Sequence, residues 1–173
     1  MGAVALAAVG CGGGGTKAPV GTAHGVVAAP KSIHLSSPAF SPGGRIPVRY
    51  TCKGQDISPP LRWTRPPSKT KELALVMIDL NAPGGPFTHW TLADIAPAVR
   101  GLSAGATAPG ARAGRNDFGK VGYRGPCPPA GRPHHYVIQL LALARRVEVS
   151  RGFSRDALGR QRPLAAGVLR GTF

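Results

Sequence analysis

Three titratable residues stand at the ends of apolar segments, and each lies next to a turn rich in Gly and Pro. Asp79 ends the run ELALVMID, His89 follows the turn NAPGGPF, and His134 follows the stretch GPCPPAGRP. Polar side chains that converge at the ends of core strands are typical of binding sites. Two imidazoles can donate hydrogen bonds to an oxyanion without a metal, and a carboxylate can orient one of them and favour its charged form. The pattern therefore predicts an anion-binding site.

The same residues permit other interpretations. Each one could be an ordinary polar residue at a strand end, and together they could form an Asp/His₂ metal set. No sequence motif identifies a catalytic nucleophile, because the chain has no Gly-x-Ser-x-Gly motif and Cys127 lies between two prolines. We therefore expect a binding protein without a cofactor or metal rather than an enzyme, and we keep a hydrolase as a less favoured alternative.

The distribution of apolar residues predicts a mainly β protein with few short helices. Twenty-five Gly and 18 Pro favour strands joined by turns over a helical bundle. The apolar run 73–78 is typical of a central strand covered on both faces, and the alternation in 46–52 indicates a half-buried strand. The Gly/Ala/Arg-rich segment 100–115 is expected to be an exposed loop. Further strands are expected at 32–35, 88–95, 135–144 and 167–173, and a short helix N-capped by Ser154 at 154–158.

The charge balance is strongly basic, with 22 Lys and Arg against 7 Asp and Glu and a net charge of +15. Nucleic acid is the usual partner of such a chain. Here the arginines are scattered, with no basic helix and no alternation of basic and aromatic residues. We therefore expect no nucleic-acid partner. Attraction to an anionic membrane surface, or a compositional bias toward Arg, Ala and Gly, explains the charge better.

The N-terminal segment resembles that of an exported lipoprotein. A short apolar run leads to Ala8-Val9-Gly10-Cys11, which is similar to a bacterial lipobox whose Cys receives the lipid, although no Lys or Arg precedes the run. We expect residues 1–30 to be a signal segment followed by a flexible Gly-rich tether, and residues 31–173 to be one domain. The protein would then be anchored to the membrane outside the cytoplasm. The alternative is a cytoplasmic protein with an incidental Cys11.

Export would leave Cys52 and Cys127 in an oxidising compartment, where they could pair. Their separation of 75 residues does not show that they are close in space, so the pairing stays open.

Four segments, in order along the chain, resemble the bacterial branch of the phosphatidylethanolamine-binding proteins, also called Raf kinase inhibitor-like proteins. They read YTCKGQDISPPLRW, LALVMIDLNAPGGPFTHWTL, GRNDFGKVGYRGPCPPAGRPHHY and GVLRGTF. The resemblance extends from about residue 33 to residue 173. It implies a β-sandwich of a large and a smaller antiparallel sheet, with a small pocket for anionic groups at one end.

The resemblance also implies which residues form that pocket. They are Asp79, Asn81, Ala82, Pro83, His89, Gly125, Pro126, His134 and Tyr136. In this interpretation the loop around Gly125 and Pro126 holds backbone N–H groups against the anion. The family pattern further implies a cis bond between Ala82 and Pro83.

Two positions depart from the family pattern. Asn81 stands where the family has a second Asp, so a role that requires two carboxylates is in doubt. His135 replaces an Arg, and it is expected on the opposite strand face from His134, outside the pocket.

We expect an exported protein that binds a small anion or a phospholipid headgroup. The alternative from the resemblance is an inhibitor of a partner enzyme, either a kinase or a peptidase, which would use the segment 96–115 beside the pocket.

Overall fold

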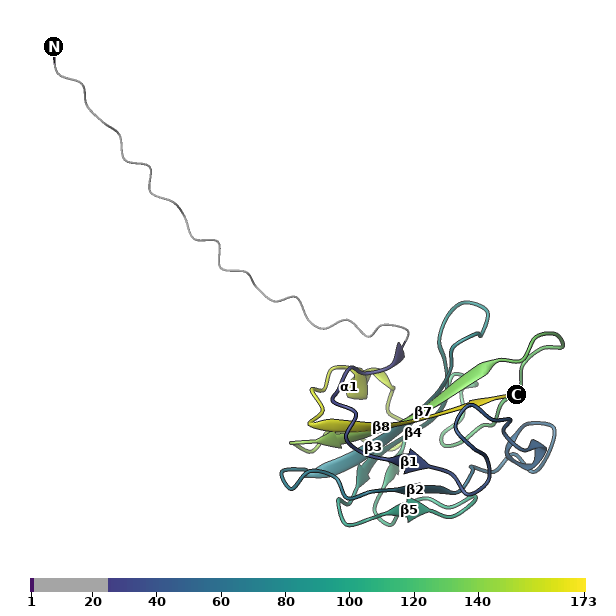
Figure 1. The fold of residues 1–173 in the computed structure, drawn as a ribbon, viewed down its shortest axis with the longest axis horizontal. Coiled ribbons are helices and arrows are strands. Elements are labelled where there is room, and N and C mark those ends of the chain that lie inside the picture. The colour runs from purple at the N-terminus through teal and green to yellow at the C-terminus, as the bar shows by residue number, and fades with distance from the viewer. Residues whose placement is uncertain (2–24) are drawn as a thin grey trace.

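The computed structural model describes Met1 and residues 25–173 (Figure 1). Cys11 and most of the predicted tether lie outside the described residues. Within the described part of the chain, no helix is long and apolar enough to cross a membrane.

Two antiparallel sheets form the domain, as the sequence predicts. The larger sheet has the order β6-β4-β3-β7-β8, and the smaller has the order β1-β2-β5. In Figure 1 the smaller sheet lies against one face of the larger one. The strands of the larger sheet are β6 (Arg112–Ala113), β4 (Phe87–Ile95), β3 (Glu72–Asp79), β7 (His135–Leu143) and β8 (Ala165–Thr172). Those of the smaller sheet are β1 (Leu35–Ser36), β2 (Leu61–Trp63) and β5 (Gly101–Leu102).

The main core lies between the two sheets. Every residue of β3 is buried, because β3 is the central strand and both of its faces are covered. Alternate residues of β3, such as Leu73, Leu75 and Met77, enter the main core with apolar residues of the smaller sheet. Asp79 continues this alternation, so the carboxylate lies at the end of the core-facing row.

The outer face of the larger sheet carries a second, smaller core. Phe153 and Leu158 cover it, and Leu158 belongs to the short helix α1 (Asp156–Gly159). The N-terminal part of the domain also covers this face. The buried amide side chain of Gln139 donates to the carbonyl of Val27 at 2.7 Å and accepts from its N–H at 3.0 Å. Residues 25–30, predicted as tether, therefore already pack on the domain.

Three sequence expectations need correction. Residues 46–52 are not a strand but include a 3₁₀ helix, Val48–Tyr50, because Pro47 starts a turn in which the Tyr50 N–H bonds to the Pro47 carbonyl. Segment 100–115 is not wholly an exposed loop, since it contains β5 and β6 and buries Leu102. The helix N-cap position is Arg155, while the Ser154 hydroxyl accepts from the Asp156 N–H at 3.3 Å.

Candidate functional site

Asp79 and His134 form a hydrogen-bonded pair at the ends of two neighbouring strands. The Nδ1 of His134 lies 2.6 Å from Oδ2 of Asp79, and the carboxylate is only 4% exposed. The other oxygen, Oδ1, accepts the N–H of Asn81 at 2.8 Å. A carboxylate acceptor requires a proton on Nδ1, so the pair fixes the orientation of the ring and leaves Nε2 for another partner.

His89 reaches the same region through a β-bulge. Met77 and Ile78 are consecutive in β3, yet they pair with Trp90 and Thr88 of β4, so His89 is the extra residue. Bulges change the direction of a side chain and are common beside functional sites. The imidazole of His89 comes to lie 5.3 Å from the ring of Tyr136, measured between centroids. A period-2 pattern cannot reveal an inserted residue, and the sequence analysis missed this bulge.

The hydrogen bonds of His89 define its tautomer. Its Nδ1 lies 2.8 Å from the carbonyl of Arg124 and 3.1 Å from that of Gly125. Carbonyl oxygens only accept, so Nδ1 donates, and in the neutral ring Nε2 is an acceptor. Burial lowers the pKa of His89 below its ordinary value, opposed in part by the hydrogen bond to the Arg124 carbonyl. The neutral ring is therefore favoured at neutral pH.

Aromatic rings surround His89. Phe87, Phe118 and Tyr136 each meet its ring edge-on, with centroid distances of 5.5, 5.3 and 5.3 Å. Phe118 is 39% exposed, and the guanidinium of Arg124 lies 5.8 Å from its centroid. Phe118 therefore covers one side of the site. The sequence analysis did not select Phe87 or Phe118, although both lie within the segments that carry the family resemblance.

Tyr136 pairs with Asp79 across β7 and β3 and is completely buried. Among the described residues its hydroxyl makes no hydrogen bond of good geometry, and the group that comes nearest to a partner is the Asp79 carboxylate. Burial raises the pKa of Tyr136, and the nearby carboxylate of Asp79 raises it further. The hydroxyl thus remains protonated at physiological pH and can donate. A buried hydroxyl without a partner costs stability, which is a common feature of a site that receives a ligand.

The loop at Gly125 and Pro126 has a different role from the one expected. The Gly125 N–H donates to Oδ1 of Asp56 at 2.7 Å, and Pro126 has no N–H. What this part of the loop offers the site is carbonyl oxygens for His89, not backbone donors for an anion. A side chain at Gly125 would place its Cβ 2.3 Å from the Tyr50 carbonyl oxygen, so only glycine fits.

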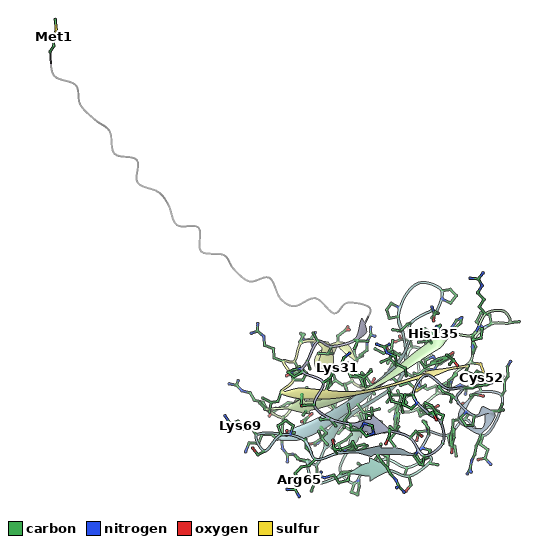
Figure 2. All side chains as sticks on the ribbon, viewed as in Figure 1. Met1, Lys31, Cys52, Arg65, Lys69 and His135 are labelled. Atoms are coloured by element: carbon green, nitrogen blue, oxygen red, sulfur yellow. A yellow bond between two sulfur atoms is a disulfide. The ribbon has the colours of Figure 1, made fainter. Side chains whose placement is uncertain are left out.

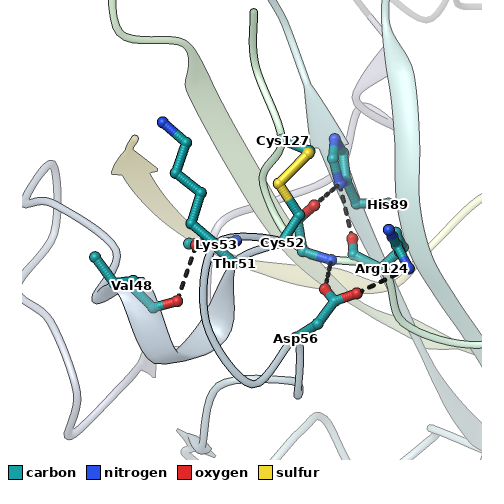
Figure 3. Close-up of a disulfide and its surroundings, with 9 residues drawn as sticks. Val48, Thr51, Cys52, Lys53, Asp56, His89, Arg124 and Cys127 are labelled. Carbon is teal, nitrogen blue, oxygen red and sulfur yellow. Dashed lines mark hydrogen bonds and ion pairs between the residues drawn. A yellow bond between two sulfur atoms is a disulfide. The ribbon is translucent and has the colours of Figure 1, made fainter.

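Cys52 and Cys127 form a disulfide with a Cα–Cα distance of 5.4 Å (Figure 3). The pairing that the sequence left open is therefore present. It connects the segment after the 3₁₀ helix to the loop that holds His89. The Cys52 N–H also donates to the carbonyl of Pro126 at 3.1 Å.

The remaining predicted residues lie beside the paired side chains rather than among them. The Oδ1 of Asn81 accepts from the backbone N–H and Nδ1 of His135, at 2.8 and 2.9 Å. His135 is exposed and outside the site, as expected. Pro83 is exposed and Ala82 half-buried. The predicted cis bond between Ala82 and Pro83 is wrong, because no peptide bond in the described residues is cis.

A metal set is not formed by these side chains. Residues 25–173 contain no group of three or more His, Cys, Asp or Glu side chains placed to hold a metal ion. Five cavities in residues 25–173 have other linings, and none of the five is lined by Asp79, His89, His134 or Tyr136. The candidate site is thus a compact arrangement of buried polar groups at one end of a β-sandwich.

The domain is thus an antiparallel β-sandwich with a polar site at the ends of its central strands. The sequence model described as phosphatidylethanolamine-binding protein matches residues 36–173. The chain therefore belongs to the phosphatidylethanolamine-binding protein family.

Relatives and solved structures agree with this assignment. A UPF0098 protein of Methanothermobacter thermautotrophicus is 43% identical over 129 residues, which cover 72% of this chain and 85% of the relative. "Putative lipoprotein LppC" of Mycobacterium tuberculosis is 36% identical over 180 residues, covering 92% and 89%. The crystal structure of Escherichia coli YbcL, a member of the mammalian PEBP family, superposes with a TM-score of 0.76 at 29% identity and covers 82% of this chain and 97% of YbcL. The homologue CT736 of Chlamydia trachomatis has a TM-score of 0.77 at 33% identity, covering 83% and 97%.

Proposed function

We propose that the domain binds a small, partly protonated oxyanion, such as inorganic phosphate or a phosphate monoester like phosphorylethanolamine, at Asp79, His89, His134 and Tyr136. The observation that carries the proposal is the 2.6 Å pair of Asp79 and His134 beside the unpartnered hydroxyl of Tyr136. The pair holds one imidazole in a fixed orientation, so that Nε2 of the protonated His134 ring is one donor, and the Tyr136 hydroxyl supplies a second.

The neutral state of His89 gives the site a preference for an oxyanion that carries a proton. Its Nδ1 already donates to the loop carbonyls, so its Nε2 offers a lone pair. A fully deprotonated oxyanion cannot use that lone pair, whereas a P–OH group can donate to it. The site therefore combines two donors with one acceptor. This set suits the monoanion of phosphate or of a phosphate monoester better than sulfate.

Export with a lipid anchor is part of the same proposal. The relative named as a lipoprotein matches over 92% of this chain, and the lipobox-like segment at Cys11 agrees with it. The disulfide between Cys52 and Cys127 also suits an oxidising compartment. In this interpretation the protein presents its binding site outside the cytoplasm.

Calorimetric titration with phosphate, phosphorylethanolamine and sulfate at pH 5.5 and 8 tests the proposal. We expect phosphate to bind more tightly at pH 5.5, where phosphate is a monoanion whose P–OH group can donate to Nε2 of His89. Sulfate should bind at least about tenfold more weakly, because it leaves the His89 acceptor unpaired. The His134→Ala variant should lose binding, and His135→Ala is the matched control, since this exposed neighbour lies outside the site. Undiminished binding in His134→Ala would refute the assignment.

A further inference from the structure

A second polar cavity lies beside the candidate site, since Phe173, which lines it, exchanges backbone hydrogen bonds with His134. Its volume is about 290 Å³, and it is lined by residues 128–133 on one side and by Arg45, Lys53, Thr172 and Phe173 on the other. None of the residues of the candidate site lines it. The Pro-rich stretch that follows Cys127 and leads to His134 forms a wall of this cavity.

The side chains around this cavity are basic. Arg45, Lys53 and Arg132 line it, and no Asp or Glu does. None of the three forms an ion pair with a carboxylate side chain in residues 25–173. Three positive charges gathered in a concave surface that no Asp or Glu side chain lines produce a local positive potential. We call this feature the basic cavity.

The ring of Phe173 holds two of these cations near each other. The guanidinium carbon of Arg45 lies 5.3 Å from the ring centroid, and Nζ of Lys53 lies 5.7 Å from it. Such cation–π contacts restrict where the charged groups lie. Two like charges held on one ring repel each other, and a bound anion would relieve that repulsion.

The disulfide fixes the two walls relative to one another. Lys53 follows Cys52 on one wall, and Pro128 follows Cys127 on the other, so the 5.4 Å Cα–Cα link joins them directly (Figure 3). Three prolines, at 128, 129 and 133, restrict the backbone of the second wall. A wall that is already rigid loses less entropy on binding, which favours affinity.

We propose that the basic cavity is a separate binding site for an oxyanion with two or more negative charges, of the pyrophosphate or phosphate-ester class. Arg45 and Arg132 can each bind phosphate oxygens with two parallel hydrogen bonds, and Lys53 adds a compact charge. The proposal does not depend on the function proposed for Asp79 and His134.

Titration with inorganic pyrophosphate tests this site with a charge-matched control. The cavity variant combines Arg45→Gln, Lys53→Gln and Arg132→Gln. The control combines Arg62→Gln, Arg65→Gln and Lys69→Gln, three exposed cations that do not line the cavity. Arg65 and Lys69 lie far from Cys52 in Figure 2. We expect the cavity variant to bind pyrophosphate at least about tenfold more weakly, and the control to stay within about twofold of the unmodified protein.

Two further arms separate this site from the first and identify the source of the anion. His134→Ala should retain pyrophosphate binding, since that side chain does not line the basic cavity. Vesicles of phosphatidic acid, whose phosphate monoester can carry two negative charges, test a lipid source when compared with vesicles of phosphatidylcholine. Pyrophosphate binding that is unchanged in the cavity variant, equally weakened in both triple variants, or lost only in His134→Ala would overturn the proposal. Binding to phosphatidic acid vesicles without any binding of pyrophosphate would overturn it as well.

Discussion

Removing the Tyr136 hydroxyl should change the stability of the protein and its affinity for phosphate in opposite directions. This buried hydroxyl has no partner in the described residues, and removing such a group relieves a cost of about 1–3 kcal/mol. We expect Tyr136→Phe to leave the free energy of unfolding unchanged or to raise it, while phosphate affinity falls severalfold. Urea unfolding and calorimetry on the same preparation measure both. A destabilised variant with full affinity would assign the hydroxyl a structural role instead.

His89 should make the protein sensitive to acid. Burial lowers the pKa of the folded-state imidazole below the value of about 6.5 for an unfolded chain. Between the two pKa values the unfolded state binds more protons, so the free energy of unfolding decreases as the pH falls below about 6.5. NMR titration of the ring should report the lowered pKa directly. His89→Gln should reduce this acid slope, and a slope equal to that of the unmodified protein would contradict the assignment.

At the level of single residues, the sequence predicts which side chains form the site but not all of their hydrogen bonds. The pattern of polar residues at strand ends selected Asp79, His89 and His134, and the structure brings these three near Tyr136. It did not show that the Gly125 N–H is used by Asp56, because the sequence does not reveal hydrogen-bond partners between distant segments.

At the level of elements, long periodic segments were predictable and short irregular ones were not. The apolar patterns of β3, β4, β7 and β8 indicated strands, because burial on one or both faces imposes the pattern. The alternation in 46–52 was misleading. There, buried Ile46 precedes a 3₁₀ helix and buried Tyr50 is its last residue, and spacing in such a turn can imitate a strand.

The loop that holds His89 has one position with no room for a side chain. An added Cβ at Gly125 would lie 2.3 Å from the Tyr50 carbonyl and 2.7 Å from the Cα of Thr51, both of them backbone atoms. We expect Gly125→Ala to lower the free energy of unfolding by about 2 kcal/mol or more. Gly159→Ala is the matched control, since its Cβ would have nothing within 4 Å. Equal thermal stabilities of the two variants would contradict this account of the loop.

For the whole molecule, the disulfide is a global constraint. It closes a loop with a sequence separation of 75, so its loss should lower stability by about 2–5 kcal/mol. The double variant Cys52→Ser, Cys127→Ser should show this in denaturant unfolding, and reducing agent should have the same effect on the unmodified protein. If neither the double variant nor the reducing agent changes the unfolding midpoint, the disulfide does not stabilise the fold.

The attachment of the protein to the membrane is a further whole-molecule prediction. We expect the protein in its own cells to remain in the membrane fraction after a high-salt wash, because lipid on Cys11 is not displaced by salt. Cys11→Ser should move it to the soluble fraction. Unmodified protein that is soluble with a free Cys11 would remove the anchor, and the charge of +15 would then reflect composition.

The central claim is that Asp79, His89, His134 and Tyr136 bind a small oxyanion. A crystal structure of the protein grown with phosphate near pH 5.5 tests it most directly. The account predicts a phosphate within hydrogen-bond distance of Nε2 of His134 and of the Tyr136 hydroxyl, with one oxygen facing Nε2 of His89. Phosphate bound only in the basic cavity, or an unoccupied site beside an intact pair of Asp79 and His134, would contradict it.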